Sequence, residues 1–86
     1  MKIRTTASFD RDYAGLPEAV RRQADKQLVR LLQDGLHPSL RLKKMKGYTG
    51  IWEVRVNDGY RITLHMEGEV WTLRRIGTHD VLKNPL

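Results

Sequence analysis

The chain has 86 residues, a net charge of +6 at pH 7 and no cysteine, a length that suits one domain with a small core. Without cysteine it has neither a disulfide framework nor a thiolate metal site. No long apolar run is present, so we expect no signal peptide and no membrane helix. A pI near 10.1 predicts an anionic partner, such as nucleic acid, the ribosome or an acidic protein. We therefore expect a single cytoplasmic domain over residues 1–86.

The first half of the chain has the pattern of a short strand followed by two helices. Residues 2–6 are typical of a strand, and Ser8 is a candidate cap for a short helix over residues 9–14. Pro17 suits the first turn of a second helix. Apolar residues then recur at helical spacing as far as Asp34–Gly35, where the glycine could end the helix with a left-handed conformation.

The second half changes to a period of two, which is typical of strands. Three strands are predicted, over residues 51–57, 60–66 and about 70–76. Turn residues separate them at Asn57–Asp58–Gly59 and at Glu67–Gly68. Together these elements predict an α+β fold, with a short N-terminal strand and two helices packed on one face of a mainly antiparallel, four-stranded twisted sheet.

The alternation also predicts which side chains lie on each face of the sheet. Apolar positions of the first two strands, among them Trp52, Val54 and Ile62, should face the helices. The opposite face should then carry the polar positions, which are Arg55, Arg61, Thr63 and His65, with Arg74 as a further candidate. This face is the expected functional surface.

A basic loop precedes the sheet and contains Lys43, Lys44 and Lys46, followed by Tyr48. A lysine run is usually solvated surface, but beside the arginines of the sheet it would contact RNA phosphates. Tyr48 could stack on a base. The histidines have no metal-ligand spacing, and the sequence has no glycine-rich phosphate loop. We expect no metal and no small-molecule cofactor.

Three local patterns, in this order, resemble the RelE/ParE toxin superfamily of bacterial toxin–antitoxin systems. They are Lys-Lys-Met-Lys-Gly at 43–47, the run Trp-Glu-Val-Arg-Val-Asn-Asp-Gly-Tyr-Arg-Ile at 52–62, and Arg-Ile-Gly-Thr-His-Asp at 75–80. The resemblance covers about residues 2–82 and implies a RelE-like fold.

The resemblance also implies a function. RelE-like members are ribosome-dependent endoribonucleases that cut mRNA, whereas ParE-like members inhibit DNA gyrase. Both are neutralised by a small antitoxin. The expected partners are therefore a cognate acidic antitoxin, the ribosome and mRNA, with no membrane. Gyrase inhibition, and a non-toxic basic module that binds nucleic acid, stay open as alternatives.

The family's functional residues carry over only in part. Its arginine after the hairpin turn falls on Arg61, and its basic or histidine residue after the last strand falls on His79. The strand lysines of some members fall on Trp52 and Val54, so they are missing here. Leu82 stands where some members have a tyrosine. In space, Lys44, Lys46 or Arg55 could replace the missing lysines.

Metal-independent RNA cleavage requires a base for the ribose 2′-OH, positive charge for the phosphorane and an acid for the leaving oxygen. We predict that Arg61 clamps the scissile phosphate and that His79 acts as the base or the acid. Arg55 would bind a neighbouring phosphate, and Asp80 would orient His79. The predicted RNA-binding residues are Lys43, Lys44, Lys46, Tyr48 and Arg74. The ordinary alternatives are an ion pair of Arg61 with Glu53 and a loop histidine at position 79.

Overall fold

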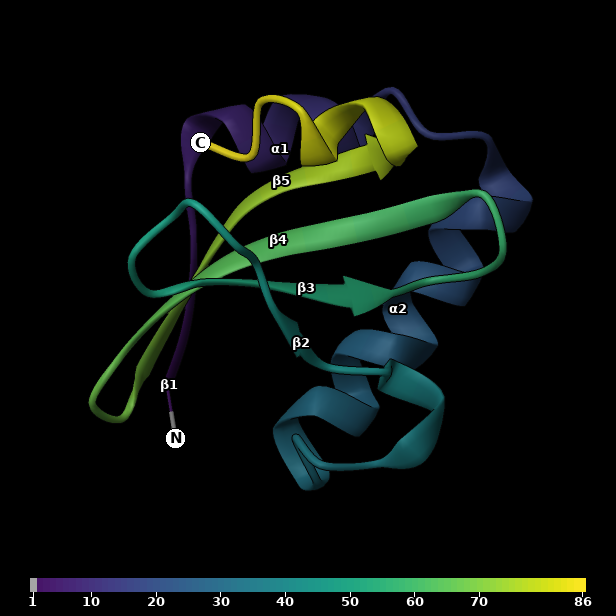
Figure 1. Cartoon of the computed structure of the whole chain (residues 1–86). Helices are drawn as coiled ribbons and strands as arrows, with labels where there is room; N and C mark the ends of the chain where they lie inside the picture. The colour runs from purple at the N-terminus through teal and green to yellow at the C-terminus, as the bar shows by residue number, and fades with distance from the viewer. Residues whose placement is uncertain (1) are drawn as a thin grey trace.

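A five-stranded sheet runs through the molecule in the order β1–β5–β4–β3–β2 (Figure 1). The computed structural model describes residues 2–86. The strands are β1 (Lys2–Thr5), β2 (Lys43–Lys44), β3 (Ile51–Arg55), β4 (Tyr60–Glu67) and β5 (Val70–Thr78). Only β1 and β5 pair in parallel among these strands. The predicted α+β fold is confirmed, with one strand more than the expected four, because the two-residue β2 in the basic loop pairs with β3.

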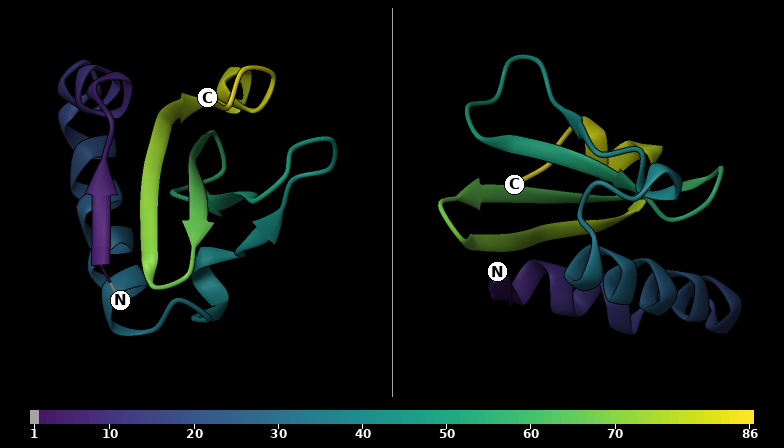
Figure 2. Two further views of the ribbon diagram at one scale, coloured as in Figure 1. Left: turned by 90° about the vertical axis from the view of Figure 1, so that its left-hand side faces the viewer. Right: turned by 90° about the horizontal axis from the view of Figure 1, so that it is seen from below.

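Both helices, α1 (Ala7–Ala14) and α2 (Glu18–Gln33), lie on one side of the sheet (Figure 2). The cap of α1 is not Ser8, as predicted, but Thr6, whose Oγ1 accepts a hydrogen bond from the Phe9 amide at 3.1 Å. The helix therefore begins two residues earlier than expected. Thr6 directly follows a strand, so its backbone already has the extended conformation that an N-cap residue requires.

The ends of α2 also differ from the prediction. Pro17 is the residue before the first turn rather than within it, and Asp34 ends the helix in an extended conformation. Gly35 is required for a different reason than the expected left-handed cap. A Cβ atom there would lie 2.7 Å from Cη2 of Trp71, so the glycine allows the end of α2 to approach the indole ring.

The core lies between the helices and the sheet. The predicted inward positions Val54, Val56, Ile62 and Leu64 are buried, together with Leu73 and Ile76 of β5 and Ala24 and Leu31 of α2. Buried Gln27 of α2 donates through Nε2 to the carbonyl oxygens of Arg55 at 2.7 Å and Ser39 at 3.1 Å. This polar contact fixes α2 against the end of β3.

The opposite face of the sheet is partly covered by the C-terminal segment. After β5 the chain forms a 3-10 turn, η2 (His79–Leu82), and then crosses the face (Figure 2). Thr63 Oγ1 donates to the Pro85 carbonyl at 2.7 Å, and both residues are fully buried. Thr63 lies on the predicted face but is covered, because the C-terminal segment folds back over the middle of β4.

Candidate functional site

Arg55 and Arg61 lie directly opposite each other where β3 and β4 approach their connecting turn. Opposed residues of an antiparallel pair point to the same face, so both arginine side chains leave the sheet on one face. Asp58 in the turn accepts a hydrogen bond from Arg55 Nη2 at 2.5 Å. This bond, and then the positive charge of Arg55, lower the pKa of Asp58. The carboxylate of Asp58 therefore offsets only one of the two positive charges of Arg55 and Arg61.

The turn holds Arg61 through backbone atoms. Arg61 Nη1 donates to the carbonyl oxygen of Asn57 and, at 2.9 Å, to that of Tyr60. Asn57 Oδ1 accepts from the amides of Gly59 and Tyr60, both at 2.9 Å, an arrangement that aspartate and asparagine stabilise in turns. Asn57 Nδ2 also donates to Gln23 of α2 at 2.6 Å. A rigid turn therefore positions the guanidinium of Arg61.

Neither arginine uses all its donors within residues 2–86. Arg55 Nε is buried without a hydrogen-bond partner there, and Arg61 bonds only through Nη1. Arg61 is not the ion-pair partner of Glu53, which lies opposite Lys43 and Thr63 instead. The unused donors of Arg61 make this end of the face suited to an anionic oxygen ligand.

His79 lies at the same end of the sheet. Gly77 of β5 pairs with Arg61, and η2 begins two residues further along with exposed His79. The path of η2 depends on Gly77, where a Cβ atom would lie 2.7 Å from Cγ1 of buried Val81. The fold therefore places Arg55, Arg61 and His79 at the same end of the sheet.

Asp80 does not take its predicted orienting position. Its carboxylate lies 3.9 Å from Nζ of Lys83 in an exposed pair. Within residues 2–86, no hydrogen bond joins it to His79. The reason is the tight 3-10 turn, in which adjacent side chains point in different directions.

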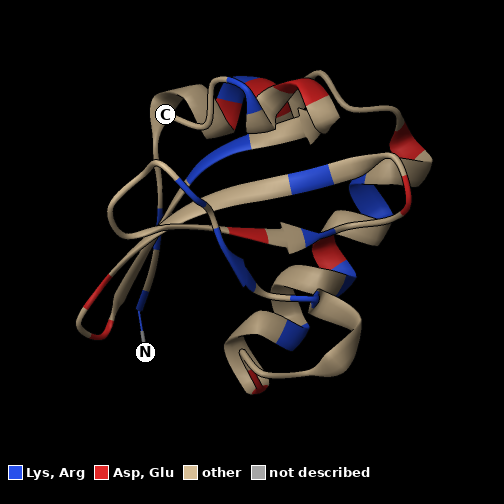
Figure 3. Ribbon diagram, viewed as in Figure 1, with Lys and Arg blue, Asp and Glu red and all other residues tan. Residues whose placement is uncertain are grey.

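The lysines of the basic loop lie on the outer edge of the sheet, on β2 and beyond it (Figure 3). Lys43 pairs with Glu53 and Lys44 with Trp52, so the two side chains point to opposite faces. Only Lys43 shares the face of Arg55. Lys46 is exposed and lines an open hollow of about 510 Å³ with Tyr48.

The remaining predicted residues, Tyr48 and Arg74, lie at the other end of the same face, where β4 turns into β5. They line a pocket of about 310 Å³ with Thr49, Ile51, His65 and Leu86. The C-terminal segment over Thr63 lies between this pocket and Arg61. The predicted site is thus divided into two groups. The division could not be predicted, because the segment that separates the groups has no strand or helix pattern.

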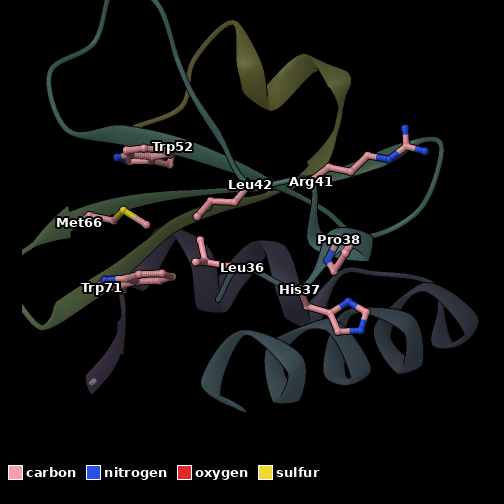
Figure 4. Close-up of a pocket in the computed structure, with 8 residues that line it drawn as sticks. All are labelled: Leu36, His37, Pro38, Arg41, Leu42, Trp52, Met66 and Trp71. Atoms are coloured by element: carbon pink, nitrogen blue, oxygen red, sulfur yellow. The ribbon is translucent and has the colours of Figure 1, made fainter. Parts of the chain in front are cut away.

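An apolar hollow of about 420 Å³ lies on the helix side of the sheet and was not predicted. Figure 4 shows the indole rings of Trp52 and Trp71 on opposite sides of it, with Met66 between them. Leu36 at its edge is 82% exposed. Val29 and Leu32 of α2 are also exposed. Apolar surface of this kind usually marks an interaction site.

Residues 2–86 contain no cluster of three or more side chains that could ligate a metal. In the same range, no helix is long and apolar enough to cross a membrane.

No protein-family model and no curated protein matches this sequence. Solved structures do match it. RelE in the RelB–RelE antitoxin–toxin complex from Methanococcus jannaschii is 21% identical with a TM-score of 0.78, over 94% of this chain and 95% of that one. The YoeB/ParE toxin from Agrobacterium tumefaciens is 18% identical with a TM-score of 0.77, over 92% and 99%. YafQ from Escherichia coli is 13% identical with a TM-score of 0.76, over 94% and 96%.

These similarities extend over almost the whole of each chain, and they establish the fold. The protein shares the α+β fold of these RelE, YoeB/ParE and YafQ toxins, the fold that the sequence patterns predicted. The similar solved structures include antitoxin–toxin complexes, namely RelB–RelE from Methanococcus jannaschii and DinJ–YafQ from Escherichia coli.

Proposed function

We propose that this protein is the toxin of a toxin–antitoxin system and that it cleaves mRNA on the ribosome without a metal ion. The observation that supports this proposal best is the pairing of Arg55 with Arg61 beside His79, on a fold shared with RelE. Two positively charged guanidinium groups on one face can bind the negatively charged oxygens of a phosphodiester. An exposed imidazole next to them can transfer a proton near neutral pH.

In the proposed reaction the ribose 2′-oxygen attacks the adjacent phosphorus while its proton passes to a base. The bond from phosphorus to the 5′-oxygen then breaks, and that oxygen takes up a proton. Arg61 would bind the non-bridging oxygens, on which negative charge increases in the transition state. Arg55 would bind a neighbouring phosphate. His79 would serve as the base or the acid. The products would be a 2′,3′-cyclic phosphate and a 5′-hydroxyl.

The cations outside this group would hold the rest of the RNA. Lys43 lies on the face of Arg55, and Lys44 and Lys46 lie along the outer edge. Contacts of this kind carry no sequence information and weaken with added salt. They would supply affinity for the mRNA and for the ribosomal RNA around it.

The apolar hollow supports a protein partner, which we propose is an acidic antitoxin. Its two tryptophans and exposed Leu36 would receive apolar side chains, and the +6 charge would attract an acidic chain. RelE and YafQ are known in complexes with RelB and DinJ, which is consistent with such a partner.

Gyrase inhibition is the second candidate, and one observation favours it. Val54 is fully buried and Trp52 lines the apolar hollow, so neither position could place a lysine beside Arg61. Asp80 also gives His79 no hydrogen bond. A toxin with a reduced catalytic set could act by binding alone.

Expression of the chain without an antitoxin, with mapping of mRNA 5′ ends, tests the proposal. Arg61→Ala and His79→Ala are compared with wild type and with Arg4→Ala, which removes an exposed arginine from the far edge strand. We expect arrest with new cuts inside translated codons for wild type and Arg4→Ala, and neither effect for the other two. Arrest without cuts would instead support gyrase inhibition, and no arrest would support a non-toxic binding module.

A further inference from the structure

The pocket at the β4–β5 end of the face carries cationic and aromatic groups that the proposed reaction does not use. Arg74, His65 and Tyr48 all line it. They come from three separate segments: β5, β4 and the basic loop. No sequence motif connects them, so their meeting is a property of the fold.

Arg74 reaches this pocket because of a β-bulge. Thr63 pairs with Arg75, but the next residue of β4, Leu64, pairs with Leu73. Arg74 is therefore the extra residue on β5. Its Nε is buried and has no hydrogen-bond partner within residues 2–86. An unsatisfied buried donor on a cation is unfavourable, and a small movement of the Arg74 side chain onto an anionic ligand in the pocket would satisfy it.

His65 is held against the basic loop and makes no hydrogen bond within residues 2–86. Gly50 adopts a φ of 72°, and a Cβ atom there would lie 2.9 Å from Cδ2 and Nε2 of the imidazole. The Gly50 carbonyl also accepts from the Met66 amide at 3.1 Å. These contacts fix the loop that carries Tyr48 beside the ring of His65.

The three side chains form a set that suits a nucleotide. A guanidinium and an imidazole can both donate hydrogen bonds to a phosphate group. Tyr48 is half-buried and lines both this pocket and the adjoining loop hollow. Stacking of a base on such a ring is tolerant of sequence.

The pocket is separate from the proposed cleavage site. His65 lies four residues from Arg61 on β4, which corresponds to about 13 Å along a strand. Between them the C-terminal segment covers Thr63. A single RNA strand could extend from one site to the other, but one nucleotide could not occupy both.

We propose that Tyr48, His65 and Arg74 form a second site that binds one nucleotide of a single-stranded RNA, with its phosphate on Arg74 and His65 and its base against Tyr48. The choice of RNA as the ligand rests on the proposed function. The site would hold a nucleotide that flanks the cleaved bond.

Nuclear magnetic resonance on the full chain tests this proposal, with adenosine 5′-monophosphate, ribose 5-phosphate and inorganic phosphate as probes. We expect saturable shifts of the Arg74 Nε–H and His65 ring signals with adenosine 5′-monophosphate. Arg74→Gln should weaken this binding about tenfold, whereas Arg4→Gln should not. Tyr48→Leu should weaken binding of adenosine 5′-monophosphate and leave binding of ribose 5-phosphate unchanged.

Three results would overturn the proposal. They are the absence of saturable shifts in wild type, shifts that Arg74→Gln leaves unchanged, and equal affinity for inorganic phosphate and adenosine 5′-monophosphate. Because Tyr48 lies in a loop, its variant tests the pocket even if Arg74→Gln fails to fold. Arg61→Ala separates the two proposals, since it should abolish mRNA cleavage and keep nucleotide binding here. Nucleotide binding without mRNA cleavage by wild type would refute the nuclease and retain the pocket.

Discussion

Asp12 of α1 and Arg75 of β5 form the main polar link between a helix and the sheet. Asp12 Oδ2 accepts from Arg75 Nε at 2.6 Å and from the Ile76 amide at 3.2 Å, and Oδ1 accepts from Arg75 Nη2 at 3.3 Å. This hydrogen bonding raises the pKa of Arg75 above its usual value. Both side chains are about three-quarters buried, with exposures of 20% and 26%, so water replaces these bonds poorly.

Replacement of Asp12 should therefore destabilise the protein. Asp12→Ala leaves the guanidinium and the Ile76 amide without an acceptor, and we expect a loss of about 1–3 kcal/mol in the free energy of unfolding. Urea denaturation measures it. Asp10→Ala, at an exposed position of the same helix, is the control and should cost less than about 1 kcal/mol. Equal losses for the two variants would contradict the assigned role of Asp12.

Asp58 gives a prediction for acidic pH. Its pKa is lowered in the folded protein, mainly by the hydrogen bond from Arg55, so the carboxylate favours the folded state above the unfolded pKa of about 3.9. That contribution is lost as the pH falls through the lower folded pKa. Carbon-detected titration of the Asp58 carboxyl should give a midpoint below the ordinary value, and Arg55→Gln should move the midpoint upward. A midpoint that Arg55→Gln does not change would refute the pairing.

The position of His79 should depend on Gly77. In Gly77→Ala the new methyl group would lie 2.7 Å from Val81 Cγ1, so η2 must shift. Overpacking of this kind costs about 1–3 kcal/mol. Val81→Gly should relieve the contact, so the double variant should lose less stability than the sum of the two single variants. Additive losses from thermal unfolding of the four proteins would show that the two residues do not interact.

The apolar hollow should contribute to binding of the antitoxin that we propose as a partner. Leu36 is 82% exposed, so Leu36→Asp should leave the free energy of unfolding almost unchanged while it weakens the complex, by about 1–3 kcal/mol for an interface anchor. Calorimetric titration measures the affinity of wild type and of Leu36→Asp for the antitoxin. Ala19→Asp, at an exposed position near the start of α2, is the control. If affinity falls equally in both variants, added negative charge and not the hollow is responsible.

Sequence patterns predicted the parts of the fold that depend on residues close together along the chain. The period of two in residues 51–66, with Asn57–Asp58–Gly59 between the strands, was enough to place Arg55 and Arg61 on one face, and the structure pairs them directly. The helical spacing of apolar residues predicted α2. What could not be predicted are long-range contacts. The bulge at Arg74 and the burial of Thr63 under Pro85 depend on how distant segments meet, and neither leaves a periodic pattern.

Because contacts between distant segments could not be predicted, only part of the geometry of the candidate site could be predicted. The hairpin and the end of β5 bring Arg61 and His79 to one end of the sheet, as expected from strand order. Asp80 was assigned only because it is the neighbour of His79, and a 3-10 turn directs it toward Lys83. His65 has no counterpart in the family pattern, yet it lies in a pocket with Tyr48 and Arg74, which are both predicted to contact RNA.

The path of the C-terminal segment has a practical consequence for reporters. Leu86 lines the pocket of Tyr48 and His65, so any affinity tag or fluorescent protein fused after it would leave the surface at that pocket. Such a fusion would cover part of the face opposite the helices and could disturb the hydrogen bond between Thr63 and the Pro85 carbonyl. Absence of growth arrest with a C-terminally tagged protein would therefore not show that the untagged chain is non-toxic.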